Sequence, residues 1–297
     1  MVDKLKNLID ADMLRYEVGF GTEPKNKETG EREALPFTAA ITLLERKLAE
    51  MQEGTWATEP PTLYLTADEK LITKLNRRRK KEGKKPIEYK PNFREAIAVT
   101  KKYKGTRSGD KPVHFDNLTA YMLGAYKTKL AIGMEADDLI SIDHNKQHKK
   151  YDTIICTRDK DLRITPGMHY GWSIGDLPAY GPFEVDTIGT LELSDQTPKK
   201  IKGTGLKFFY AQLITGDVVD NIPGLPRSGP VAAYDALNRC KTEKGLFKKV
   251  AEMYEKKFEK ADTDWRVYFK EQAALLWMIQ YLNDKGEPVH HVMFDER

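Results

Sequence analysis

Apolar residues along this chain fall into two patterns, short continuous runs and longer segments with helical spacing. The short runs have the length of buried β-strands and lie at residues 5–12, 62–66, 151–157 and 168–174. Apolar side chains recur at helical spacing over residues 37–51, 115–130, 206–214, 231–237 and 245–282. Strands that alternate with amphipathic helices predict an α/β fold with a mostly parallel sheet flanked by helices.

The remaining segments are polar or rich in Gly and Pro. Residues 19–34 and 176–204 have the composition of surface connections. The stretch from Lys74 to Lys111 holds 15 Lys or Arg against 4 acids, and long basic segments of this kind are commonly poorly ordered when unbound. We therefore expect the first two segments to be surface loops and the basic segment to be poorly ordered in the absence of nucleic acid.

Three of the predicted strands end on carboxylates. Asp10 and Asp12 close the first, Asp68 follows the second, and Asp159 and Asp161 follow the third. An open α/β sheet places its ligands at the carboxyl ends of its strands, so these acids are candidate site residues. Asp10 adjoins the apolar run and is the better candidate of its pair, since Asp12 could instead cap the next turn.

Two further acidic groups have helical spacing. Glu135 and Asp138 are three residues apart and share a face if the segment is helical, with Asp137 beside them in the first turn. Asp217 and Asp220 have the same spacing, so one helical turn would aim both in one direction. Taken alone, the first of these two patterns is also typical of a solvated acidic helix start.

Charge and composition narrow the function. The chain has 297 residues and a net charge of +4; the segment from Lys74 to Lys111 carries +11, so the rest carries −7. This asymmetry favours a protein in which one part binds phosphates and another binds cations. No apolar run reaches transmembrane length, the N-terminus lacks a signal-peptide pattern, and only Cys156 and Cys240 are cysteines, which predicts a cytoplasmic protein without disulfides or a cysteine zinc site.

The candidate carboxylates number nine: Asp10, Asp68, Glu135, Asp137, Asp138, Asp159, Asp161, Asp217 and Asp220. Like charges that converge raise each other's pKa, so such a group needs compensating cations. Oxygen ligands suit Mg²⁺ or Mn²⁺, and two such ions can bracket a scissile phosphate. No histidine shows ligand spacing with these acids, which argues against a zinc hydrolase.

Three motifs in this order resemble the 5′-nuclease superfamily, which includes flap endonucleases, phage 5′→3′ exonucleases and the 5′-nuclease domain of DNA polymerase I. Residues 133–138 match its G-x-E-A-D-D, Asp159-Lys160-Asp161 matches its D-x-D after a strand, and residues 216–224 match its G-D-x-x-D-N-I-x-G. The resemblance covers about Leu5 to Leu237. It implies a PIN-like sheet, a basic helical arch over about residues 74–130, and a helix–three-turn–helix over about residues 206–240.

The resemblance also implies roles for the acidic residues. The catalytic cation would be held by Asp10, Asp68, Glu135, Asp137 and Asp138. Asp159 and Asp161 would lie between two ions, and Asp217 and Asp220 would serve the second. Residues 103–107 look like the family's Y-K-x-x-R, so Lys104 would contact the scissile phosphate and Arg107 would stabilise developing charge.

Nucleic-acid contacts follow from the same resemblance and from the basic composition. The candidates are Arg77, Arg78, Arg79, Lys84, Lys85, Arg94, Tyr103, Gly224 and Gly229. The family's loop commonly reads G-x-G-x-K-x-A, but residues 227–233 lack the lysine and contain Pro230, which has no N–H to donate. This departure leaves open the K⁺ ion that the family often binds there.

Together these features predict a monomeric, metal-dependent 5′→3′ exonuclease and flap endonuclease of phage type that acts in DNA replication. Its partner would be DNA with a 5′ single-stranded end or flap, or an RNA primer paired with DNA. We expect an α/β core over residues 1–204 and a helical duplex-binding region over residues 205–297. The alternatives are a non-catalytic binder of DNA junctions, a PIN-type RNA nuclease, and an acidic domain whose carboxylates only cap helices.

Overall fold

The computed structural model describes residues 4–26, 28–106, 109–147 and 152–291. The chain divides into two compact units, neither of which is continuous in sequence. Unit 1 comprises Met1–Asn92, Gly109–Asp159 and Gly167–Phe183, and unit 2 comprises Phe93–Ser108, Lys160–Pro166 and Glu184–Arg297. Among the described helices, none has the length and apolar content needed to cross a membrane.

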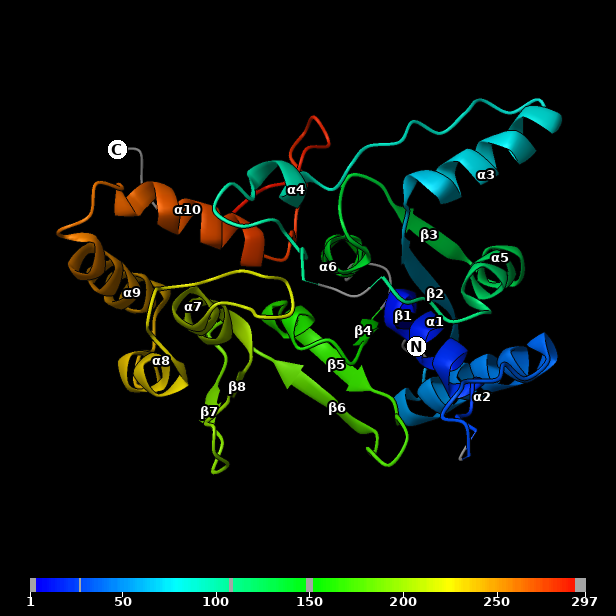
Figure 1. The fold of residues 1–297 in the computed structure, drawn as a ribbon, viewed down its shortest axis with the longest axis horizontal. Coiled ribbons are helices and arrows are strands. Elements are labelled where there is room, and N and C mark those ends of the chain that lie inside the picture. Colours follow the sequence, from blue (N-terminus) through cyan, green and yellow to red (C-terminus); the bar gives the residue numbers. More distant parts are fainter. Residues whose placement is uncertain (1–3, 27, 107–108, 148–151, 292–297) are drawn as a thin grey trace. The chain divides into compact units, whose positions relative to one another are not determined.

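A six-stranded sheet forms the centre of unit 1 (Figure 1). Its strands are β1 (Leu5–Asp10), β2 (Glu59–Thr66), β3 (Thr128–Ala131), β4 (Asp152–Cys156), β5 (Gly167–Gly171) and β6 (Tyr180–Val185). Their order is β3-β2-β1-β4-β5-β6, and β6 ends within unit 2. The pairings from β3 to β5 are all parallel, which confirms the predicted α/β class.

Helices cover both faces of this sheet. The strand side chains alternate: Leu63 and Leu65 enter the core formed with α1 (Ala11–Gly21), α2 (Phe37–Thr55) and α5 (Phe115–Ala125). Tyr64 between them points to the other face, where its hydroxyl donates to Asp143 Oδ2 of α6 (Ala136–Gln147) at 2.8 Å. Because both faces are covered, the strands are almost continuously apolar, as the sequence indicated.

Unit 2 is mainly helical. Its elements are α4 (Phe93–Ile97), the 3₁₀ turn η1 (Asp161–Ile164), β7 (Leu191–Leu193), β8 (Ile201–Gly203), α7 (Gly205–Thr215), α8 (Pro230–Leu237), α9 (Glu243–Phe258) and α10 (Trp265–Leu276). Arg94 of α4 is fully buried and donates to Leu275 O at 3.0 Å and to Trp277 O at 2.7 Å. Its guanidinium thus joins a short N-terminal segment of this unit to the end of α10.

The structure departs from the sequence-based elements in several places. Residues 128–131, expected at the end of a helix, form strand β3, because Tyr126 is extended and ends α5. Residues 176–204, expected as connections, contain β6, β7 and β8. The predicted helical tail of residues 245–282 consists of α9 and α10 with a break between them, and it ends at Leu276.

The basic segment also differs from expectation. Residues 74–81 belong to a regular helix, α3 (Glu69–Lys81), and the short helix α4 follows, while the other described residues of the segment lie in no helix or strand. Asp68 caps the start of α3, and four basic residues fill its last turn, where they complement the negative end of the helix dipole. The expectation of disorder was therefore wrong for this part of the segment.

Candidate metal centre

Asp10 is a buried carboxylate of unit 1 whose pKa is raised. It ends β1 and caps α1, and its Oδ1 accepts the Met13 N–H at 3.1 Å. Its Oδ2 accepts the Thr157 hydroxyl at 2.9 Å. Burial, followed by the neighbouring charge of Asp12, raises the pKa of Asp10 to about 6. An ionised Asp10 at neutral pH is therefore costly unless a positive charge offsets it.

Asp12 already has a counter-charge. Arg15 Nη2 lies 2.7 Å from its Oδ1. The backbone N–H of Thr66 also donates to its two oxygens, at 3.2 and 3.1 Å. Of the two aspartates at the end of β1, Asp10 is thus the one whose charge is least compensated.

The G-x-E-A-D-D segment forms the start of α6. The Glu135 N–H donates to Asp138 Oδ2 at 3.1 Å, and the Glu135 carbonyl accepts the Leu139 N–H at 3.3 Å, as in a helix N-cap. Asp138 is fully buried and Asp137 is half-buried. The predicted helix start is confirmed, although Glu135 precedes the helix rather than sharing its face with Asp138.

Two threonines join the strand ends, and the sequence reading missed both. Thr66, at the end of β2, donates its N–H to Asp12 and accepts the Ala136 N–H on its hydroxyl at 2.9 Å. Thr157, just after β4, donates to Asp10 and accepts the Asp159 N–H at 2.9 Å. These hydroxyls bring the ends of β1, β2 and β4 and the start of α6 to one edge of the sheet. The available signal was a hydroxyl residue that closes an apolar run two residues before an aspartate.

Asp68 lies apart from these hydrogen bonds. Its side chain is 53% exposed, its Oδ1 accepts the Leu71 N–H at 2.7 Å, and Lys111 Nζ lies 3.5 Å from its Oδ2. The observed role of Asp68 is to cap α3.

In unit 2, the half-exposed side chain of Lys160 lies close to two candidate carboxylates. Its ammonium contacts Asp217 Oδ2 and lies 3.4 Å from Asp161 Oδ1, which also accepts from Gln212 at 2.6 Å. Asp217 is buried. Burial opposes its ionised form, but hydrogen bonding and attraction from Lys160 outweigh burial, so the pKa of Asp217 lies below its usual value.

Asp217 and Asp220 lie in a tight loop and not in the predicted helical turn. Asp217 and Ile222 exchange two backbone hydrogen bonds of 2.8 Å. The Asp217 carboxylate accepts the N–H groups of Val219 at 2.8 Å and Asp220 at 3.3 Å. A short acidic side chain that bonds its own downstream backbone competes with helix formation, which explains the difference.

Tyr103 and Lys104 are both close to Asp220. The Tyr103 hydroxyl donates to Asp220 Oδ2 at 2.9 Å, and Lys104 Nζ lies 3.9 Å from the same oxygen. The Lys104 N–H donates to Asp220 O at 2.9 Å, and Lys104 has a positive φ of 53°. Arg107, the other predicted catalytic cation, lies outside the described residues.

The predicted nucleic-acid contacts are of two kinds. Arg77, Arg78, Arg79, Lys84 and Lys85 lie on or just after α3, with Arg79 half-buried and the others exposed. Arg94 and Tyr103 are buried and hold unit 2 together, so we exclude Arg94 from the contacts proposed below.

The two glycines of the loop after α7 also differ. Gly224 is buried with φ +64°, and a Cβ there would lie 2.2 Å from Gly216 N, so its role in packing is clear. Gly229 precedes α8, and a Cβ there would meet nothing within 4 Å.

Divalent cations fit the donor chemistry of these acids. In the part of the chain that the structure describes, no three His, Cys, Asp or Glu side chains are grouped closely enough to hold a metal ion as they stand. The fit therefore rests on donor type and charge. All candidates are carboxylates, which favours Mg²⁺ or Mn²⁺ over softer metals, and buried Asp10 lacks a cationic partner equivalent to the one that Asp12 has.

No protein-family model matches the chain, and no curated protein does. Among solved structures, the T5 D15 protein co-crystallised with metal ions is similar, with 13% identity, a TM-score of 0.43, and coverage of 92% of this chain and 93% of that chain.

Two further structures have similar scores. The bacteriophage T5 D15 flap endonuclease in a pseudo-enzyme–product complex with DNA and metal ions gives 14% identity, a TM-score of 0.48 and the same coverage. The catalytic core of Rad2 in complex with DNA substrate gives 13% identity and a TM-score of 0.42, over 95% of this chain and 75% of that chain. At these identities and scores the three structures carry no argument about what this chain does.

Proposed function

We propose that this chain is a divalent-metal-dependent 5′→3′ exonuclease and structure-specific flap endonuclease that hydrolyses DNA phosphodiesters near 5′ ends or junctions. The observation that carries the proposal is Asp10: a buried carboxylate at the end of a central parallel strand, with a raised pKa and acidic neighbours on adjoining strand ends. This is the position at which an α/β sheet binds its ligands. The order of the three acidic motifs supports the same assignment.

The residues take the roles that their placement allows. In unit 1, Asp10, Glu135, Asp137 and Asp138 would hold a catalytic cation, with Asp68 as a more distant member. Asp159 in unit 1 and Asp161 in unit 2 would each contribute a carboxylate, and Asp217 and Asp220 would serve a second cation. Bound Mg²⁺ supplies charge stabilisation to a scissile phosphate and increases the acidity of water.

The remaining groups hold the carboxylates in place or offer positive charge to phosphate oxygens. Thr66 and Thr157 fix the backbone and carboxylates at the strand ends through their hydroxyls. Tyr103 orients Asp220, and Lys104 offers an ammonium for a phosphate oxygen. The exposed cations of α3 bind the phosphates of the DNA strand.

A structural role for the acids is the rival that the geometry also favours. Asp10, Asp68 and Asp138 each accept a backbone N–H at a helix start, as capping residues do. If capping were their only role, substitutions would change stability and leave no nuclease activity to lose.

Cleavage of a 5′-end-labelled flap duplex tests the proposal. Wild type should release 5′ fragments with Mg²⁺ and none with EDTA. Asp138→Asn, which keeps a cap acceptor, should reduce the rate by at least about 100-fold, because it removes a charge from the cation site. Asp152→Asn, an exposed aspartate at the start of β4, is the matched control and should cleave like wild type.

The same assay separates the alternatives. If the duplex is bound but not cleaved with Mg²⁺ or Mn²⁺, the chain is a non-catalytic protein that binds DNA junctions. Cleavage confined to an RNA strand of the same sequence would leave a PIN-type RNA nuclease. Equal rates for Asp138→Asn and wild type would refute the acidic site.

A further inference from the structure

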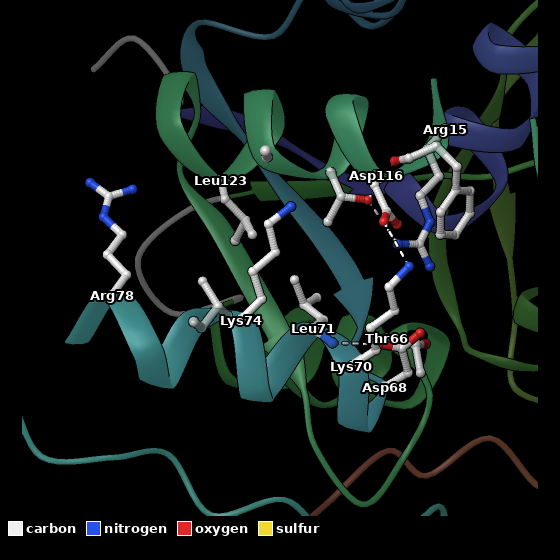
Figure 2. Close-up of a pocket in the computed structure, with 13 residues that line it drawn as sticks. Arg15, Thr66, Asp68, Lys70, Leu71, Lys74, Arg78, Asp116 and Leu123 are labelled. Carbon is white, nitrogen blue, oxygen red and sulfur yellow. Dashed lines mark hydrogen bonds and ion pairs between the residues drawn. The ribbon is translucent and has the colours of Figure 1, made fainter. Parts of the chain in front are cut away.

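A pocket of about 220 Å³ lies between α3 and α5 in unit 1 (Figure 2). Leu71, Lys74 and Arg78 line it from α3, and Asp116 and Leu123 line it from α5. Thr66, Asp68 and Arg15 also contribute to its wall. Because Thr66 ends β2 and binds Asp12, the pocket adjoins the strand ends that carry the candidate metal centre of this unit.

The floor of the pocket is apolar. Leu71, Leu75, Ala120 and Leu123 line it, and Leu71 of α3 and Leu123 of α5 both point into the space between the two helices. An apolar surface of this kind, open at the protein surface between two helices, is suited to a flat organic group rather than to a bare ion.

The pocket also has a row of cations along one wall. Lys70, Lys74 and Arg78 recur every fourth residue of α3, so they project from one side of the helix at intervals of about 6 Å. Lys74 has no ion-pair partner among the described residues, while Arg78 Nε lies 2.9 Å from Glu82 at the exposed end of the helix. A regular row of cations matches a chain with a regular row of anions.

Lys70 occupies the end of the row nearest the strand ends. Its Nζ lies 2.9 Å from Asp116 Oδ2, and both side chains are exposed. The pKa of Asp116 is lowered, first by its hydrogen bond with Lys70 and, against desolvation, by the charges of Lys70, Lys74 and Lys111. Four cations and two acids line the pocket, so the charge of its lining is net positive despite the presence of Asp116.

We infer that this pocket binds one nucleotide unit of a single DNA strand, with its base on the leucines of α3 and α5 and its flanking phosphates on Lys74 and Arg78. The choice of DNA as the ligand rests on the proposed nuclease function. The inference adds a site that recognises the single strand beside the reaction centre, independent of sequence, because leucine side chains and lysines do not read base edges.

An acidic amphipathic peptide is the other ligand that could combine apolar and anionic groups. The nucleotide is favoured because the cations stand on one wall in register with the helix repeat, whereas the leucines form the floor. A strand that repeats phosphate and base at each step presents its two kinds of group in the same way.

The test uses the full chain in EDTA, so that no strand is cut, with methyl-labelled leucines observed by NMR. Unlabelled pentathymidylate is the probe, and thymidine 5′-monophosphate is the short comparison. We expect the methyl signals of Leu71, Leu75 and Leu123 to shift in a saturable manner, with the pentamer binding at least about tenfold more tightly because it reaches more cations.

Matched variants localise the binding. Ala120 is exposed and lines the pocket, so Ala120→Phe should fill the space and weaken pentamer binding at least about tenfold, while Asn117→Phe, exposed on the same helix outside the pocket, should not. Lys74→Glu should weaken binding more than Lys80→Glu, which makes the same charge change on α3 outside the pocket. Retained folding of all four variants is checked by their unperturbed core methyl signals.

Three outcomes would overturn the inference. Pentamer binding that leaves these methyls unshifted, or that Ala120→Phe does not weaken, would place the strand elsewhere. Tighter binding of a pentaglutamate–leucine peptide than of the pentamer would make the pocket a peptide site. The cleavage assay above is read separately: normal cleavage with no shifts refutes only the pocket, and shifts without any cleavage refute only the nuclease.

Discussion

At the scale of single residues, Asp10 links stability to pH. Its carboxyl has an ordinary pKa of 3.8 and a folded-state pKa of about 6, so the folded chain binds this proton more tightly than the unfolded chain does. The protonated Asp10 carboxyl therefore makes its full contribution to the free energy of unfolding below about pH 4, and this contribution is lost as the pH rises through about 6. The difference corresponds to at most about 3 kcal/mol.

We therefore predict that Asp10→Asn is more stable than wild type at pH 7 in EDTA, by up to about 3 kcal/mol, and that this advantage disappears near pH 4. Asparagine keeps an oxygen that can accept the Met13 N–H. Urea unfolding at a series of pH values measures the effect. Parallel pH curves for the two proteins would contradict it, and Asp152→Asn should follow wild type throughout.

The contact between Lys160 and Asp217 makes stability depend on pH in the opposite direction. Because it lowers the pKa of Asp217, it contributes stability above the unfolded-state pKa that is lost as the pH falls through the folded-state value. We predict that Lys160→Met lowers the free energy of unfolding by about 1–2 kcal/mol at pH 7 in EDTA, since Lys160 is half exposed and solvent screens part of the pair. The loss should shrink toward pH 3.

The control for this prediction is Lys248→Met on α9. Lys248 is exposed and lies 3.9 Å from Glu252, a surface pair that should cost less than about 0.5 kcal/mol. Equal losses for the two variants at every pH would show that Lys160 does not act through Asp217.

The sequence could predict the identity of the acidic residues but not all of their contacts. Asp10, Asp138 and Asp159 were recognisable because each follows an apolar run or lies in a motif. The hydroxyl contacts of Thr66 and Thr157 were not, since a threonine at a strand end is common and its partner lies far away in sequence, 147 residues in the case of Asp10 and Thr157. Burial of Arg94 was hidden for the same reason, since its partners Leu275 and Trp277 lie at the end of α10, more than 180 residues away.

At the scale of elements, the loop between α7 and α8 depends on Gly224. Its φ is +64°, its N–H donates to Gln272 Oε1 at 3.0 Å, and its carbonyl accepts the Tyr268 hydroxyl at 2.9 Å. The loop is therefore fixed to α10 by both backbone groups of one residue. Motif reading predicted a glycine-containing loop here but not this attachment.

We predict that Gly224→Ala lowers the free energy of unfolding by about 3 kcal/mol or more, because the new Cβ would collide with the Gly216 backbone and the positive φ disfavours alanine. Gly229→Ala is the matched control and should change stability by less than about 0.5 kcal/mol, since nothing lies within 4 Å of a Cβ there. Urea unfolding measures the free energy of unfolding of both variants. Similar losses in the two variants would exclude the steric explanation.

The elements show which sequence signals are reliable. Long periodic segments such as residues 37–51 gave helices, and the apolar runs of the central sheet gave strands. Strand β3 is only four residues long and half-buried, so it had no pattern of its own and was absorbed into the preceding helix. The loop from Asp217 to Ile222 was misread because the spacing of two aspartates is the same in a turn and in a helix.

At the scale of the whole molecule, the asymmetry of charge would govern the proposed binding to DNA. The segment from Lys74 to Lys111 holds 15 of the chain's 49 basic residues and only 4 acids, while the rest of the chain is net negative. Such a segment displaces counterions from DNA when it binds. Salt should then weaken binding far more than it weakens folding.

We predict that the dissociation constant for flap DNA, measured by fluorescence anisotropy in EDTA, rises at least about 100-fold between roughly 50 and 200 mM salt. Arg77→Glu with Lys80→Glu should reduce the slope of this dependence. Lys248→Glu with Lys249→Glu, the same charge change on α9, should leave the slope nearly unchanged. Slopes altered equally by both pairs would mean that overall charge, and not the basic segment, controls binding.

Unit 2 is assembled from three stretches of chain that are far apart in sequence. Thr100 donates its N–H to Glu271 at 2.7 Å, a separation of 171 residues, and Arg94 reaches Trp277 over 183 residues. During synthesis, the first of these stretches leaves the ribosome long before its partners exist. Until the last helix has been translated, Arg94 has not met the acceptors that it has in the folded unit, so the nascent chain has to wait for its own C-terminal region before this unit can close. A truncation after α9 would thus affect residues near position 100 as directly as it affects the C-terminus.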